Sequence, residues 1–149
     1  MKRLWRTGVF LFIFPGFIMG CAMNYKLKPT QITLFIEAGP HINGGVLLPL
    51  DIIVVDASLS DLILDIGPEV WFGHSSRDRL VKKELRRFAI SSGEIREIKV
   101  DVTRKTKRII IYADYENDMD RNGQQLVIEP KRWHFNYTIH IGLNKMELL

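Results

Sequence analysis

Four histidines are the first residues whose type suggests chemistry, because imidazole is a common metal ligand. Zinc sites combine His and Cys at short spacings, with two ligands only a few residues apart. His41, His74, His134 and His140 show no such spacing. His134 and His140 fall on one side of an expected strand, but about 20 Å apart, too far to share a metal ion within that strand. We therefore expect surface histidines and no zinc site.

Acidic and amide side chains alternate in residues 114–122, just ahead of Gly123. The stretch Asp118-Met119-Asp120-Arg121-Asn122-Gly123 has the ligand order that begins a calcium-binding loop, and Glu129 stands where such a loop places its bidentate acid. Flanking helices are not expected, since residues 126–128 have the composition of a strand. A calcium site over residues 118–129 and a solvated hairpin loop are the two alternatives. We favour the hairpin loop and predict neither a metal ion nor a cofactor.

Sequence motifs of common enzyme sites are absent. The chain contains no Gly-x-Ser-x-Gly, no phosphate-binding loop and no dinucleotide-binding fingerprint. Ser75 and Ser76 follow His74, yet their position ahead of an expected helix favours a capping role over nucleophilic catalysis. The sequence thus predicts a protein without enzymatic activity.

Cys21 is the single cysteine of the chain, and it follows a segment typical of an export signal. Residues 1–6 include Lys2, Arg3 and Arg6, residues 9–19 are apolar, and Gly20 is a small residue before the cysteine. These are the parts of a secretory signal peptide. The apolar run is about 11 residues long, whereas a membrane-spanning helix needs roughly 20. We therefore predict a cleaved signal over residues 1–20.

The four residues Ile18-Met19-Gly20-Cys21 resemble the lipobox of bacterial lipoproteins. This resemblance implies cleavage before Cys21 and attachment of lipid to its thiol and to the new amino group. The next residue is Ala22 and not Asp, which implies sorting to the outer membrane, with the protein facing the periplasm. The alternative is a plain secretory signal followed by an incidental buried cysteine.

The mature chain has the size of one domain. Removing residues 1–20 from the 149 leaves 129, which we divide into a lipidated tether over residues 21–30 and a single domain over residues 31–149. Three of the 21 Lys and Arg lie in the signal, so the mature chain carries 18 basic and 17 acidic side chains, a formal charge of +1. This balance gives no reason to expect a nucleic-acid partner.

Alternating apolar residues predict strands in most of the domain. Gln31 to Glu37 alternates, and Leu50 to Val55 is apolar on both faces, which indicates a strand covered on both sides. A loop rich in Gly and Pro joins these two strands. Further strands are expected over residues 98–102, 108–115, 126–128 and 133–143, with a last edge segment from Met146. Because the later connections are short and polar, the predicted fold is mainly β, an antiparallel sandwich.

One helical insertion is predicted over residues 76–88. Ser75 or Ser76 would cap it, and Val81, Leu85 and Phe88 recur at the spacing of one helix face. The preceding residues 57–75 fit two alternatives, because their apolar positions match both a strand and a short helix. Both alternatives stay open for that stretch.

The order of these features resembles the TssJ family, the outer-membrane lipoproteins of type VI secretion systems. Three stretches carry the resemblance, which extends over residues 18–145: His41-Ile42-Asn43-Gly44-Gly45 leading through Pro49 to Val55, then Ser92-Gly93-Glu94, then Ile109-Ile110-Ile111-Tyr112-Ala113-Asp114-Tyr115. The first loop lacks the Arg-containing, Pro-rich run that the family has there. The chain is therefore identified as a divergent member.

The resemblance implies a transthyretin-like β-sandwich that is held at the outer membrane by lipid on Cys21. It also implies that the sandwich binds the periplasmic domain of an inner-membrane secretion protein, TssM. The family's contact is the loop between the first two strands, which assigns partner binding to Asn43, Gly44, Gly45, Val46, Leu47 and Leu48. Adjacent apolar residues in a Gly-rich loop suit such a contact, although they could equally fold back over the end of the sandwich. The alternative function is an unrelated outer-membrane lipoprotein whose sandwich binds a ligand or an envelope polymer.

Overall fold

The computed structural model describes residues 30–81, 84–116 and 121–149. The predicted signal peptide, Cys21 and the tether up to residue 29 lie outside the described residues, and so do Asp118 and Asp120 of the acidic stretch. No helix within the described ranges is long and apolar enough to cross a membrane.

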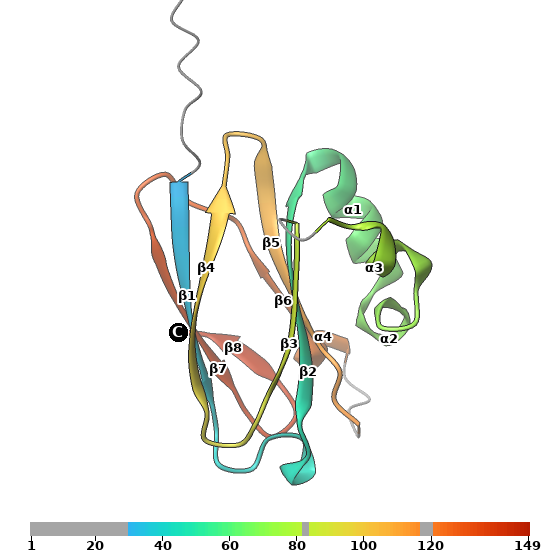
Figure 1. Ribbon diagram of the computed structural model, residues 1–149, viewed down its shortest axis with the longest axis vertical. Coiled ribbons are helices and arrows are strands. Elements are labelled where there is room, and N and C mark those ends of the chain that lie inside the picture. Colours follow the sequence, from blue (N-terminus) through green and yellow to red (C-terminus); the bar gives the residue numbers. More distant parts are fainter. Residues whose placement is uncertain (1–29, 82–83, 117–120) are drawn as a thin grey trace, which may run out of the picture.

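Two four-stranded sheets face each other and form a sandwich, as Figure 1 shows. The first sheet has the order β4 (Ile95–Val102), β1 (Thr30–Ala38), β7 (Asn136–Ile141) and β8 (Met146–Leu148). The second sheet has the order β3 (Leu85–Ile90), β2 (Leu48–Asp56), β5 (Thr106–Ala113) and β6 (Gln125–Ile128). The predicted mainly β sandwich is confirmed.

Among the strands of the described ranges, the pairing is antiparallel except between β1 and β7, which run parallel. Parallel neighbours need a long connection, whereas antiparallel neighbours can be joined by a tight turn. β1 and β7 meet this condition because residues 39–135 lie between them. Antiparallel pairing is thus correct for the other strand pairs, although the short connections β3–β4 and β4–β5 join strands of different sheets and not paired neighbours.

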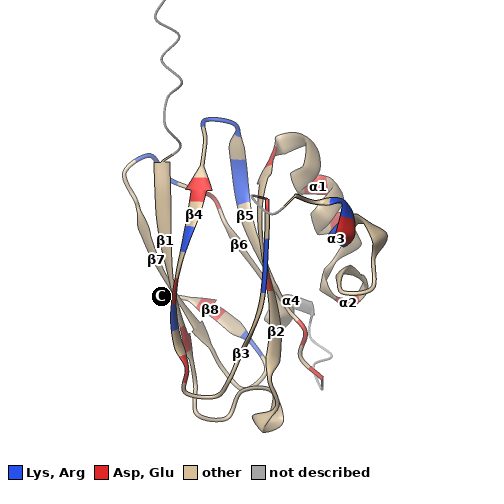
Figure 2. Cartoon of the chain, viewed as in Figure 1, with Lys and Arg blue, Asp and Glu red and all other residues tan. Residues whose placement is uncertain are grey.

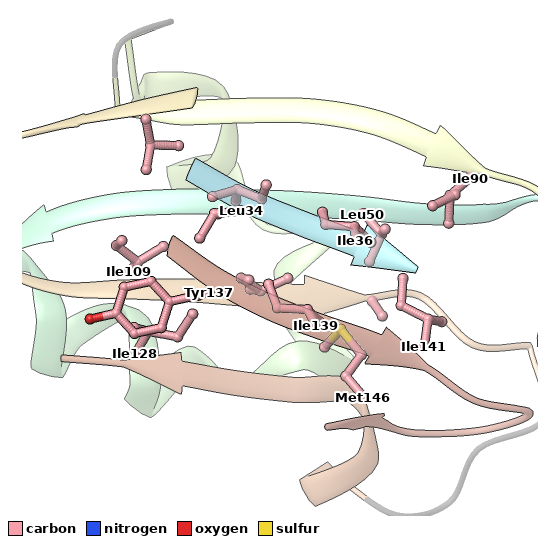
Figure 3. Packing of buried hydrophobic residues seen from close by; sticks show 14 of the residues in the cluster. Leu34, Ile36, Leu50, Ile90, Ile109, Ile128, Tyr137, Ile139, Ile141 and Met146 are labelled. Carbon is pink, nitrogen blue, oxygen red and sulfur yellow. The ribbon is translucent and has the colours of Figure 1, made fainter. Parts of the chain in front are cut away.

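The main core fills the space between the two sheets. Alternate residues of β1 and β7, such as Leu34, Ile36, Ile139 and Ile141, point into it and are almost completely buried. They meet Leu50 and its neighbours on the second sheet, as Figure 3 shows. The two-residue period of the sequence therefore predicted the inward face of these strands.

The second sheet is covered on its outer face as well. Ile53, Ile110 and Tyr112 point away from the main core and form a second buried cluster with Ile63 and Trp71 of the helical insertion. The Tyr112 hydroxyl donates a hydrogen bond to the Ile63 carbonyl at 2.8 Å. This arrangement explains why the residues of β2 are apolar on both faces.

The helical insertion consists of three short helices between β2 and β3: α1 (Ala57–Ile66), α2 (Pro68–Trp71) and α3 (Ser75–Arg79). The Asp56 carboxylate caps α1 by accepting hydrogen bonds from the backbone N–H groups of Ser58 and Leu59, at 3.0 and 3.2 Å. Gly67, with φ of 73°, ends α1 in a conformation that favours glycine. The open choice for residues 57–75 is thus settled as helix.

The helical insertion is confirmed, but the helix predicted over residues 76–88 is too long. α3 ends at Arg79, and Leu85 begins β3, which pairs with β2 from Leu48↔Ile90 to Ile53↔Leu85. Leu85 is buried in the cluster under the helices, and Arg86 and Arg87 are exposed. Backbone pairing along the free edge of β2 outweighs the helical spacing, because helix propensity is only a weak preference that tertiary contacts override.

The strand predicted over residues 133–143 is shorter than expected. β7 covers only Asn136–Ile141, while Trp133, Phe135 and Leu143 are exposed. A turn in which the Gly142 N–H donates to the Lys145 carbonyl at 2.8 Å joins β7 to β8. The other elements are the 3-10 turn η1 (Ile42–Gly45) and α4 (Arg121–Gln124).

Candidate partner-binding site

The connection between β1 and β2 lies at the end of the sandwich opposite Thr30, where the tether joins the domain (Figure 1). We call this pole the loop end: the connection over residues 39–47, the turn over residues 142–145 and residues 114–116 after β5. β1 runs from one pole to the other, so the fold itself separates the candidate contact loop from the tether.

Three consecutive residues of the loop have left-handed backbone conformations. Asn43, Gly44 and Gly45 have φ of 46°, 64° and 87°. Apart from glycine, asparagine is among the residues that adopt this region most readily. A Cβ atom at Gly44 or Gly45 would meet no heavy atom within 4 Å, so the backbone angle and not crowding requires glycine there. The sequence Asn-Gly-Gly therefore determines the shape of the loop tip.

Asn43 fixes this shape with both ends of its amide. Its Nδ2 donates to the Leu47 carbonyl at 3.3 Å, and its Oδ1 accepts from the Glu116 N–H at 2.8 Å. Its backbone N–H donates to the Leu143 carbonyl at 3.1 Å. The side chain is buried, and these bonds join three segments that are far apart in sequence. Asn43 thus acts as a positioning residue within the loop.

Gly39 attaches the base of the loop to the first sheet. Its N–H donates to the Ile141 carbonyl at 2.8 Å, and its carbonyl accepts from the Gly93 N–H at 2.9 Å. A Cβ atom at Gly39 would lie 3.2 Å from the Ile141 oxygen, closer than side chains are normally found. Glycine is needed here because two backbones approach closely.

The predicted contact residues divide into two groups. Gly44, Gly45, Val46 and Leu47 are exposed, with Val46 at 48% and Leu47 at 59% of full side-chain exposure. Leu48 is fully buried as the first residue of β2, and Asn43 is buried as well. Val46 and Leu47 therefore do not fold back over the sandwich, while Leu48 belongs to the core.

Leu143 is an exposed apolar residue beside the loop that the sequence pattern assigned to the inside of a strand. Its carbonyl accepts the Asn43 N–H, and its side chain is exposed. The Gly-Leu-Asn-Lys sequence over residues 142–145 has the composition of a turn, which could have placed it there. We call Val46, Leu47 and Leu143 the apolar patch of the loop end.

One carboxyl group at the loop end has a shifted pKa. Asp114 follows β5, and its N–H donates to the Pro49 carbonyl at 3.0 Å. Desolvation raises the pKa of Asp114 above its ordinary value, and the nearby Asp51 and Glu116 charges add to this, while Arg77 opposes it. The charged form of Asp114 is therefore disfavoured in the folded protein.

The other candidate residues are dispersed. The His74 ring Nδ1 accepts the Ser76 N–H at 3.2 Å, the His134 ring lies 4.5 Å from the Tyr137 ring, and Glu129 lies 3.5 Å from Arg108. Within the described ranges, no three His, Cys, Asp or Glu side chains come together in a way that could hold a metal ion. The calcium alternative depends on Asp118 and Asp120, which lie outside those ranges.

Among the comparisons with known proteins, only the comparison with solved structures found matches. No protein-family model matches the chain, and no curated protein matches it either. The T6SS lipoprotein TssJ1 from Pseudomonas aeruginosa superposes with a TM-score of 0.66 at 19% identity, over 81% of this chain and 95% of that one. A chain of a type VI membrane complex gives a TM-score of 0.65 at 15% identity, over 82% and 99%.

A third neighbour is the Lip protein of Serratia marcescens, a membrane-bound component of the type VI secretion system. It superposes with a TM-score of 0.64 at 11% identity, over 81% of this chain and 97% of that one. The resemblance to TssJ lipoproteins is thus confirmed at the level of the fold, across nearly the whole length of these neighbours.

Proposed function

We propose that this protein is a lipoprotein of a type VI secretion membrane complex, held in the outer membrane by lipid on Cys21. Its loop end binds the periplasmic domain of an inner-membrane, TssM-type protein. The role is structural and involves no catalysis. The observation that carries the proposal is the position of the Asn-Gly-Gly loop, in a fold shared with type VI lipoproteins, at the pole opposite the tether.

The dimensions of the chain suit such a connecting role. β1 spans nine residues, Thr30–Ala38, or about 27 Å at the rise of a strand. Residues 21–29 could reach at most about 30 Å if fully extended. The loop end could therefore stand no more than about 60 Å from the lipid anchor, measured along these two segments. The partner must approach the outer membrane within this distance.

The loop is suited to protein binding because its shape is fixed before the partner arrives. The hydrogen bonds of Asn43 and Gly39 hold the backbone, so binding need not order the loop. A preformed contact of this kind loses less conformational entropy on association. Val46 and Leu47 present apolar side chains at the tip, where their burial against a partner would contribute to affinity.

The test of the loop is a double charge substitution. Val46→Asp/Leu47→Asp should abolish co-purification of the partner's periplasmic domain while the melting temperature changes little, because both side chains are exposed. The matched control is Leu62→Asp/Val70→Asp, which changes the same residue types at 52% and 53% exposure on the helical insertion. Equal co-purification by both double variants would show that the loop tip is not the contact. Leu48 is left intact, since changing it would disturb the core.

The test of the anchor is separate. Cys21→Ser should release the protein from the membrane fraction into the soluble periplasmic fraction. The variant should still bind the partner's periplasmic domain, because the loop end does not depend on the lipid. Persistent membrane association of Cys21→Ser would contradict anchoring through this residue.

A further inference from the structure

The pole where the tether joins the domain has two basic segments on either side of the first strand. We call this pole the tether end: Thr30, residues 103–107, which form the β4–β5 turn and the start of β5, and the segment over residues 130–135. Thr30 pairs with Val102 at the end of β4, and the Thr33 N–H donates to the Phe135 carbonyl at 2.7 Å. Both basic segments therefore lie next to the start of β1.

Positive charge is concentrated in these two segments. They contain five Lys or Arg and no acidic residue: Arg104, Lys105, Lys107, Lys131 and Arg132. Figure 2 shows the blue segments at this end of the sandwich. Among the described residues, none of these five cations forms an ion pair with a carboxylate. Their charge is thus available to an external anionic surface.

Acidic residues that neighbour the two basic segments have contacts of their own. Asp61 and Glu129 lie 2.7 and 3.5 Å from Arg108, and Asp101 accepts a hydrogen bond from Gln31 at 3.1 Å. Asp56 accepts hydrogen bonds from Ser58 and the Leu59 N–H, which together with the weaker attraction of Lys105 lower its pKa. Hydrogen bonds do not neutralise a carboxylate, so the formal charges of Asp101 and Asp56 offset part of the positive charge, and the two basic segments keep an excess of cations.

Aromatic side chains accompany the cations. Trp133 is 78% exposed, and the Arg132 guanidinium lies 5.1 Å from the centre of its ring. Phe135 is partly exposed and lines a hollow of about 590 Å³ together with Arg104, Lys131 and Arg132. An exposed Trp beside Lys and Arg is the composition found where proteins meet the interfacial region of a bilayer.

We propose that the tether end docks on the surface of the bilayer that holds the Cys21 lipid, and that this surface contains anionic phospholipid. The five cations lie over the headgroups, and Trp133 enters the interfacial region. This inference rests on the proposed lipid anchor, because the short tether is what brings this pole to the membrane. Docking would orient the long axis of the sandwich away from the membrane and point the loop end at the partner.

The test measures contact of Trp133 with lipid. The mature chain contains two tryptophans, the buried Trp71 and the exposed Trp133. The purified lipoprotein is reconstituted into vesicles that contain brominated phosphatidylcholine, with or without phosphatidylglycerol, and tryptophan quenching is recorded. We expect strong quenching only with phosphatidylglycerol present, and its loss at high salt. Trp133→Phe gives the baseline contributed by Trp71.

The charge dependence is tested with matched triple variants. Arg104→Gln/Lys131→Gln/Arg132→Gln should lower the equilibrium constant for docking, as reported by the quenching, roughly fivefold per cation removed, or about a hundredfold in all. The control Arg79→Gln/Arg86→Gln/Lys99→Gln removes the same charge from exposed sites outside the tether end and should change nothing. Equal quenching in the two vesicle types, or equal loss in both triple variants, would overturn the proposal.

Failure of the anchor and failure of the docking surface are distinguishable. Mass spectrometry of the mature chain reports whether Cys21 carries lipid. A lipidated chain without Trp133 quenching overturns the docking surface and leaves the anchor standing. A chain without lipid that still sediments with phosphatidylglycerol vesicles, in a salt-dependent way, overturns the anchor and supports the docking surface.

Discussion

The two poles of the sandwich differ in how they are built. The loop end consists of glycines, a buried Asn43 and hydrogen bonds that fix each backbone segment, with an apolar patch on top. The backbone of the tether end is also held by hydrogen bonds, such as those between Thr103 and Thr106 and from the Lys131 N–H to the Tyr137 hydroxyl, but its surface consists of exposed cations and aromatics. A defined shape recognises one protein partner, whereas a diffuse charge adapts to many lipid headgroups. One sandwich can thus carry a specific contact and a tolerant one at its two ends.

The largest expected effect lies in the scaffold that both ends share. Asp51 on β2 is fully buried and accepts hydrogen bonds from Trp71 Nε1 at 2.8 Å and from Arg77 at 2.6 and 3.0 Å. Arg77→Ala leaves the carboxylate buried without its counter-charge, which should cost about 3 kcal/mol of unfolding free energy. Urea denaturation measures this loss.

The scaffold prediction also tests whether the two poles are independent. Below its melting temperature, Arg77→Ala should keep both partner binding and vesicle quenching, because Arg77 lies in neither pole. The double variant Asp51→Asn/Arg77→Met removes the isolated charge and should recover part of the lost stability. Loss of binding at one pole alone would mean that the helical insertion positions that pole.

The second largest effect concerns Asn43. Asn43→Gly keeps the left-handed backbone but removes the acceptor of the Glu116 N–H and the donor to Leu47, so we expect a loss of about 1–2 kcal/mol. Asn43→Asp keeps the acceptor, but it buries a carboxylate and places an oxygen against the Leu47 carbonyl, so it should lose more. Partner affinity should fall in the same order. Vesicle quenching should stay unchanged, since the tether end is at the other pole.

Sequence periodicity predicted the strands whose side chains alternate between core and surface, because burial imposes that period directly. Residues 85–88 were misassigned because Leu85 and Phe88 fit a helix as well as an edge strand, and only the pairing with β2 decides between them. The tether end was missed for a related reason. Trp133 and Phe135 continue the alternation of β7, although β1 pairs with this segment only from Asn136 onward.

The candidate site was predictable to the extent that local chemistry determines it. Asn-Gly-Gly indicates a left-handed turn from composition alone, and Val46 and Leu47 are exposed at its tip. The burial of Leu48 depends on where β2 begins, which is set by its partner Ile90. The bonds from Asn43 to Glu116 and Leu143 join distant segments, and no local pattern contains that information.

A smaller effect is expected from the backbone of the loop tip. Gly45→Ala places a side chain at φ of 87°, where an L-residue is strained by about 1 kcal/mol. Gly73→Ala is the matched control, because it has no left-handed φ and the nearest atom to its new Cβ lies 4.0 Å away. Thermal unfolding should therefore separate the two variants. Equal melting temperatures would mean that the loop tip relaxes without cost.

The smallest effects concern carboxyl groups near the two poles, whose pKa values shift in opposite directions. Near the loop end, desolvation raises the pKa of Asp114 above its ordinary value of 3.8. Near the tether end, hydrogen bonds from Ser58 and Leu59 lower the pKa of Asp56 below 3.8. At neutral pH the charged form of Asp114 therefore weakens the folded state, whereas the charged form of Asp56 strengthens it.

The signs of the two substitutions follow from this difference. The protonated Asp114 carboxyl favours folding, and this contribution is fully present below the unfolded pKa. It is lost as pH rises through the raised folded pKa. At pH 7 Asp114→Asn should therefore be slightly more stable than wild type. The contribution of Asp56 is present above its unfolded pKa and is lost as pH falls through its lowered folded pKa, so Asp56→Asn should be slightly less stable at pH 7. Melting temperatures from neutral pH down to about 3 measure both differences, which should shrink toward zero in acid as the carboxyls are protonated. Two stability differences of the same sign would contradict this contrast between Asp114 and Asp56.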